Sequence, residues 1–128
     1  MSRLTESQPW LELTAHQREI APLHMRALFK QDAQRFDKFS LRFNDILLDY
    51  SKNLITDQTL ALLLQLAREC EVPNWRDKMF SGVKINTTEN RAVLHTALRN
   101  RSPRPVRLDG EDIMPGIRRV LAQMRHFS

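Results

Sequence analysis

Residues 39–50 read FSLRFNDILLDY, and this stretch departs from the helical spacing found elsewhere in the chain. Apolar side chains at every second position from Phe39 to Phe43 alternate with polar ones, which is the period of a half-buried β-strand. The central pair, Asn44 and Asp45, tolerates the left-handed backbone conformation that a two-residue hairpin turn requires. We therefore predict a β-hairpin over residues 39–50. A lone hairpin is only marginally stable in water, so it must pack against other elements.

The residues that follow the hairpin predict an apolar helix. Thr56 can cap its N-terminus, and Asp57 suits the positive end of the helix dipole. The body, from Leu60 to Ala67, carries leucines on its flank as well as on its main stripe, so it requires burial on more than one side. Pro73 is expected to end it. A domain of short helices has little material to cover such a helix, which indicates that the sequence belongs to something larger.

Five further helices are predicted from stripes of period 3.6 and from capping residues. They cover Pro9–Ile20, Ala21–Phe29, a segment from an Asn74 cap to Gly82, Glu89–Arg99 after a Thr88 cap, and a last helix from Asp112 onward. Gly82 lies where a left-handed C-terminal residue belongs, and Asp109-Gly110 marks a turn. The predicted fold class is α+β: residues 1–128 form a single segment that is mostly α with one β-hairpin.

The composition excludes several classes of protein. Hydrophobic residues make up 41% and charged residues 27% of the 128 positions, which is typical of an ordinary soluble protein rather than a disordered one. The three glycines lie too far apart for a glycine-rich phosphate loop. The longest apolar run, residues 60–64, is too short for a membrane span, and the first eight residues lack the apolar core of a signal peptide. We therefore expect a cytoplasmic protein without a membrane partner.

Candidate metal ligands and nucleophiles are sparse. The single cysteine, Cys70, excludes an internal disulfide, and it ends an apolar helix, where an inert thiol is expected. The histidines share no metal-binding spacing with one another or with this cysteine. They are His16, His24, His95 and His126. No serine has the flanking glycines of a nucleophile elbow. We predict no metal site and no nucleophilic catalysis.

Glu89 and His95 could in principle form an acid–base pair. Six residues turn a helix by about 600°, so the two side chains would point to different sides of the predicted helix. Glu89 is better explained as a first-turn acid, and His95 as a residue of the helix surface or the core edge. We therefore predict no catalytic and no substrate-binding residues in this chain.

Basic residues gather near the C-terminal end. The net charge is +5, and most of the excess lies after residue 98. Four arginines could contact the phosphates of a nucleic acid: Arg99, Arg101, Arg104 and Arg107. No aromatic residue is interleaved for base stacking, and acidic residues follow from Asp109. We therefore expect a solvated surface or intramolecular ion pairs. The alternative is a small basic nucleic-acid-binding or protein-interaction module that uses residues 99–107.

The middle of the chain carries a more specific signal. Residues 49–53 read DYSKN, and residues 79–100 read MFSGVKINTTENRAVLHTALRN. This order closely resembles the N-terminal region of the glucose-6-phosphate isomerase family. The resemblance runs from about Trp10 to Phe127. It implies a segment of an enzyme with two α/β sandwich domains of the sugar-isomerase type, extra helices, and a homodimeric assembly.

The resemblance also implies a function. The family interconverts glucose 6-phosphate and fructose 6-phosphate, in glycolysis and gluconeogenesis, through an enediol intermediate and without a cofactor. Its phosphate loop, catalytic glutamate, ring-opening histidine and lysine would all lie beyond Ser128. We therefore expect a structural role for this segment and no activity of the chain alone. The implied partners are the rest of the isomerase chain and a homodimer partner, with sugar phosphate bound only in the full enzyme. A further alternative is a fragment that docks on a full-length isomerase.

Overall fold

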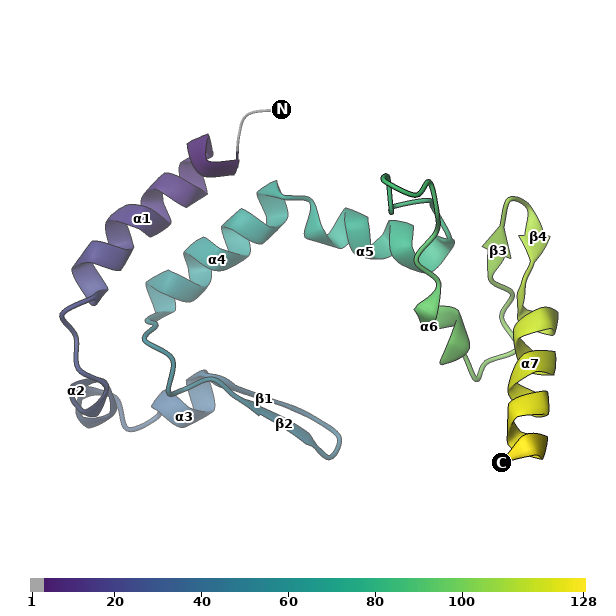
Figure 1. The fold of residues 1–128 in the computed structure, drawn as a ribbon. Helices are drawn as coiled ribbons and strands as arrows, with labels where there is room; N and C mark the ends of the chain where they lie inside the picture. The colour runs from purple at the N-terminus through teal and green to yellow at the C-terminus, as the bar shows by residue number, and fades with distance from the viewer. Residues whose placement is uncertain (1–3) are drawn as a thin grey trace. The chain divides into compact units, whose positions relative to one another are not determined.

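The computed structural model describes residues 4–128, which divide into two compact units that meet at Cys70 and Glu71 in the sequence (Figure 1). Both units are built largely from helices, and each contains one two-stranded antiparallel sheet. The predicted class, mostly α with a β-hairpin, is confirmed. The sugar-isomerase domains expected beyond residue 128 stay a prediction.

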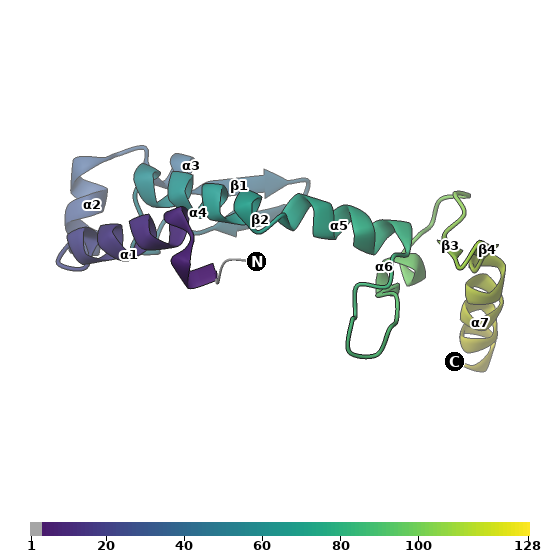
Figure 2. The ribbon, with the colours of Figure 1, turned by 90° about the horizontal axis from the view of Figure 1, so that it is seen from above.

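The first unit is organised around two long helices. In chain order it contains η1 (Leu4–Glu6), α1 (Gln8–Ile20), α2 (Met25–Gln31), α3 (Arg35–Lys38), β1 (Ser40–Phe43), β2 (Ile46–Asp49) and α4 (Asp57–Glu69). Helices α1 and α4 lie side by side in both views (Figures 1 and 2). The start of α2 at Met25 corrects the predicted start at Ala21. The ring of His24 accepts a hydrogen bond of 3.2 Å from the Arg26 N–H and caps the helix.

The predicted hairpin is confirmed. Strands β1 and β2 pair antiparallel, with Leu41 opposite Leu48 and Phe43 opposite Ile46. Asn44 in the two-residue turn has φ 51°, the left-handed conformation that asparagine tolerates. Local turn chemistry therefore determines the register of this sheet.

Helix α4 begins after the Thr56 cap, as predicted, and it ends at Glu69, before the predicted end at Pro73. The Thr56 hydroxyl accepts the Thr59 N–H at 3.3 Å, and the Thr59 hydroxyl accepts the Thr56 N–H at 2.9 Å, which completes a capping box. The prediction that Pro73 ends this helix is wrong. Glu71, at φ 53°, breaks the helical path, and Pro73 lies in the first turn of the next helix, where its missing N–H costs nothing.

The second unit contains α5 (Val72–Ser81), α6 (His95–Leu98), β3 (Arg107–Leu108), β4 (Glu111–Asp112) and α7 (Met114–Phe127). The C-terminal helix is confirmed, and so is left-handed Gly82, at φ 81°, as the C-cap of α5. Asn74 does not cap α5, because the helix already begins at Val72. The turn at Asp109-Gly110 is confirmed, and it joins two short strands that were not predicted from the sequence.

The predicted helix over Glu89–Arg99 is wrong for most of its length. Asn86 and Arg91 instead exchange two backbone hydrogen bonds of 3.1 Å each, and between them Asn90 adopts φ 51°. The Asn86 side chain accepts hydrogen bonds from the Glu89 N–H and the Thr88 hydroxyl. Short polar side chains thus offer the backbone an alternative to the helix. Only the four-residue helix α6 remains.

Candidate functional site

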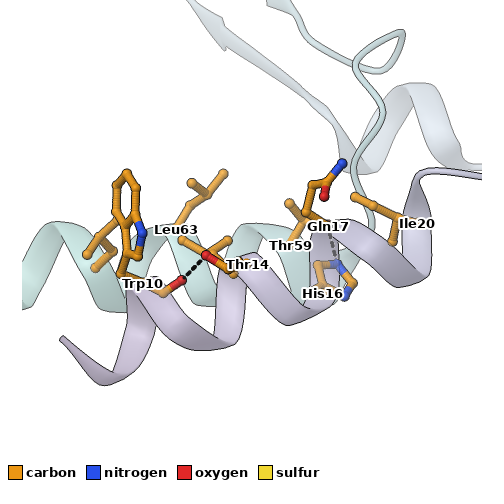
Figure 3. Close-up of a pocket in the computed structure, with 9 residues that line it drawn as sticks. Trp10, Thr14, His16, Gln17, Ile20, Thr59 and Leu63 are labelled. Atoms are coloured by element: carbon orange, nitrogen blue, oxygen red, sulfur yellow. Dashed lines mark hydrogen bonds between the residues drawn. The ribbon is translucent and has the colours of Figure 1, made fainter. Parts of the chain in front are cut away.

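An apolar groove lies between α1 and α4 in the first unit, with a volume of about 470 Å³ (Figure 3). It is lined by Trp10, Leu13, Thr14, His16, Gln17, Ile20, Thr59, Leu63 and Leu66. Two polar side chains in this lining, His16 and Thr59, are buried, with exposed fractions of 4% and 7%. The groove therefore offers apolar surface around one polar contact.

His16 connects the two helices. Its Nε2 lies 2.7 Å from Oγ1 of Thr59, and its Nδ1 lies 3.4 Å from a carboxylate oxygen of Glu19. A hydroxyl, an imidazole and a carboxylate in this order also form the catalytic triads of hydrolases. Here the hydroxyl of Thr59 already accepts the Thr56 N–H in the capping box, and it is buried. The arrangement therefore acts as a clamp between α1 and the start of α4.

A second polar cluster surrounds Arg35, whose side chain is only 3% exposed. Its guanidinium donates hydrogen bonds to the carbonyl oxygens of Ser51, Asn53 and Ile55, at 2.9, 2.9 and 3.0 Å. The guanidinium carbon also lies 4.7 Å from the ring centroid of Phe39. One cation thus ties the loop after the hairpin, which contains most of the DYSKN motif, to α3.

The carboxylate of Asp49 orders the beginning of the same loop. It accepts hydrogen bonds from the Ser51 hydroxyl at 2.6 Å and from the Ser51 N–H at 2.9 Å. These bonds lower the pKa of the Asp49 carboxyl, the hydroxyl contributing most, because they favour the charged form. Asp49 and Ser51 of the DYSKN motif therefore stabilise a turn. The motif could be recognised in the sequence, but this structural role could not be predicted from it.

The candidate residues of the sequence analysis are dispersed over separate elements. His24 caps α2, exposed His95 begins α6, and exposed His126 lies near the end of α7. Glu89 is exposed in the turn between Asn86 and Arg91, so it shares no helix with His95. Within residues 4–128, no three His, Cys, Asp or Glu side chains group as a metal site. In the same part of the chain, no helix has the length and apolar character to cross a membrane.

The arginines of residues 99–107 lie on the surface of the second unit. Arg99 donates to the His95 carbonyl at 3.1 Å, and Arg107 donates to the Gly110 carbonyl at 3.0 Å. Arg101 and Arg104 are also exposed. Across residues 71–128, the salt bridges are formed by other basic side chains. For residues 99–107 we expected either a solvated surface or intramolecular ion pairs. The structure shows the solvated surface.

The most unusual property of the chain is its exposed surface. The accessible area is 10529 Å². A globular protein of 15.1 kDa exposes about 7,000 Å², and two separate globules of half that mass expose about 8,500 Å². Few hydrophobic residues among those described are buried: Ile20, Leu28, Phe39, Ala97 and Met114. The chain therefore exposes more surface than two separate globules of its total mass would, as the apolar character of α4 predicted.

Comparison with known proteins gives this surface a context. Residues 49–128 match the family model described as phosphoglucose isomerase. The chain is 53% identical over all 128 residues to glucose-6-phosphate isomerase of Methylococcus capsulatus, and 50% identical to glucose-6-phosphate isomerase 1 of Neisseria gonorrhoeae. It spans 23% of the length of each of these relatives. These matches agree with the resemblance seen in the sequence and give no support to a nucleic-acid-binding module.

Proposed function

Because this chain belongs to the phosphoglucose isomerase family, we propose that it is the N-terminal part of an enzyme that interconverts glucose 6-phosphate and fructose 6-phosphate. One observation carries this proposal: the chain aligns over its full length, with 53% identity, to a protein named for that activity. The reaction moves a proton between adjacent carbons of the sugar through an enediol intermediate. It requires a positioned base and a binding site for the phosphate dianion.

In this proposal the chain contributes scaffold to the enzyme. The buried polar groups already have structural partners: His16 holds α4, and Arg35 holds three backbone carbonyls. Many large apolar side chains of the chain are exposed, as expected for a segment that packs against the remaining polypeptide of the enzyme. The catalytic and phosphate-binding groups would then come from beyond residue 128. The homodimer and the cytoplasmic location are part of the proposal and rest on the family resemblance.

A segment exchange tests the proposal. Residues 1–128 replace the matching segment of the Methylococcus capsulatus enzyme, and the chimera is produced in a host that lacks its own isomerase. Conversion of fructose 6-phosphate is followed by coupling the product to a glucose-6-phosphate dehydrogenase. We expect turnover by the chimera, and none by the isolated 128-residue chain or by the remainder of the enzyme without it.

Two results would contradict the proposal. One is a folded chimera, judged by circular dichroism and size-exclusion chromatography, that converts no substrate. The other is turnover by the purified 128-residue chain itself, which would place the reacting groups within these residues.

A further inference from the structure

The β1–β2 hairpin has one apolar and one largely polar face. The register places Leu41 opposite Leu48 and Phe43 opposite Ile46, and residues two apart on a strand point to the same side. One face therefore presents Leu41, Phe43, Ile46 and Leu48. Their exposed fractions are 61%, 73%, 67% and 56%. The opposite face carries Ser40, Arg42, Leu47 and Asp49, and three of these four side chains are polar, so this face can remain exposed to solvent.

This apolar face is uncovered in the first unit, although the base of the hairpin is well fixed. Phe39 and Tyr50 join the two strand ends by a backbone hydrogen bond of 2.9 Å and by an edge-to-face ring contact. The guanidinium carbon of Arg35 also lies 4.7 Å from the centroid of the Phe39 ring. The four apolar side chains together expose on the order of 500 Å², which is as large as the largest apolar patch on a typical monomer. An exposed apolar patch of this size on a well-ordered hairpin is typical of an interaction surface.

The amount of uncovered surface indicates which partner. Each protein in a standard interface buries about 800 Å², whereas this chain exposes about 2,000 Å² more than two separate globules of its total mass. One interface of this standard size with a second copy would cover less than half of that excess. The relatives contain more than three-quarters of their length outside the matched segment, which is enough polypeptide to cover the rest.

We propose that the apolar face of the β1–β2 hairpin packs against an apolar layer of the same isomerase polypeptide, formed by the residues that follow the matched segment. This inference rests on the proposed function and adds to it the face by which the first unit docks. A second copy of the chain is the competing occupant.

Cysteine labelling tests the inference on the active chimera described above and on the 128-residue chain. Phe43→Cys and Ile46→Cys report on the apolar face, and Arg42→Cys and Leu47→Cys are matched controls on the opposite face. The labelling rate with a maleimide is measured for each site, and mass spectrometry separates it from labelling of Cys70. In the chimera we expect the two apolar-face cysteines to react at least about tenfold more slowly than the controls, because labelling then requires local opening. In the 128-residue chain, all four should react at similar rates at every protein concentration.

The outcomes separate the two occupants and the two proposals. Equal rates at all four sites in an active chimera would overturn the docking inference and leave the proposed function intact. Protection of the apolar-face sites in the 128-residue chain that grows with protein concentration would overturn it in favour of a second copy. Using two reporters keeps the test valid if one substitution disturbs the fold. An inactive, folded chimera would reject the proposed function and, with it, the inference that depends on it.

Discussion

The Nε2 atom of His16 lies 2.7 Å from the Oγ1 atom of Thr59, and this contact joins residues 43 positions apart in the sequence. The same hydroxyl accepts the Thr56 N–H in the capping box of α4. One oxygen atom thus fixes both the first turn of α4 and the position of α1 beside it. The clamp keeps two amphipathic helices in place in a unit that has few buried apolar side chains.

The first prediction is that Thr59→Val destabilises the chain. Valine keeps the branched shape, but it removes the hydroxyl that accepts the Thr56 N–H, which is one half of the capping box. It also leaves Nε2 of the buried His16 ring with only the longer, 3.4 Å contact to the Thr56 hydroxyl. We expect a loss of about 1–3 kcal/mol in the free energy of unfolding, measured by urea denaturation with circular dichroism. Thr59→Ser, which keeps the hydroxyl, should lose much less. Equal stability of the valine and serine variants would show that the hydroxyl contributes nothing.

A second prediction concerns Arg35. In Arg35→Met the three carbonyls that the guanidinium binds lose their donor, so the free energy of unfolding should fall by about 2 kcal/mol or more. Arg35→Lys should be intermediate, because a single ammonium lacks the guanidinium's planar set of donors. Arg42→Met, on the exposed hairpin, is the control and should change stability by less than about 0.5 kcal/mol. A methionine variant as stable as this control would contradict the assigned role.

The features that could be predicted from the sequence are those set by neighbouring residues. The hairpin follows from alternation and a turn at Asn44, and α4 follows from its Thr56 cap and its apolar body. Gly82 could be placed as a C-cap for the same reason. Each of these signals acts within one or two turns of the chain, so one sequence contains it in full.

The polar clusters could not be predicted, because they depend on contacts between distant residues. No spacing rule relates His16 to Thr59, or Arg35 to the carbonyls of residues 51–55. The failed helix after Thr88 has a different cause. Its apolar positions do favour a helix, but Asn90 adopts φ 51° and the Arg91 N–H binds the Asn86 carbonyl, so the backbone turns back where the helix would begin. The periodicity was present, and this local turn outweighed it.

A third prediction concerns the pH dependence of the loop after the hairpin. The pKa of the Asp49 carboxyl is lowered below its ordinary value of 3.8, first by the Ser51 hydroxyl and then by the Ser51 N–H. The stabilisation that it provides is therefore fully present above pH 3.8 and is lost as the pH falls through the lower, folded-state pKa. Ser51→Ala should raise the Asp49 pKa toward 3.8 in a carboxyl NMR titration.

Asp32 is the internal control for this titration. Its pKa is also lowered, mainly by a hydrogen bond from the Lys38 ammonium, and it has no contact with Ser51. The pKa of Asp32 should therefore stay the same in Ser51→Ala. If the pKa of Asp49 also stays the same, the hydroxyl is not the main cause of its shift.

The fourth prediction compares the three glycines, which should respond to alanine in three different ways. At Gly110 the φ of 89° disfavours a side chain, yet a β-carbon would meet no atom within 4 Å, so Gly110→Ala should cost about 1 kcal/mol. At Gly82 the φ of 81° adds the same cost, and a β-carbon would also collide with the backbone carbonyl oxygen of Arg107. Backbone cannot move aside as a flexible side chain does, so Gly82→Ala should cost at least about twice as much as Gly110→Ala.

At Gly116, alanine is expected to raise the stability of the protein instead of lowering it. It lies in α7 without a positive φ, and a β-carbon there would meet nothing within 4 Å. Alanine restricts the unfolded chain and favours the helix, so Gly116→Ala should stabilise the protein by about 0.5 kcal/mol. Urea denaturation of the three variants under one set of conditions gives the order directly. Equal losses for Gly82→Ala and Gly110→Ala would mean that the Arg107 carbonyl is not packed against the end of α5, because that carbonyl is the one close contact that a β-carbon at Gly82 would make and a β-carbon at Gly110 would not.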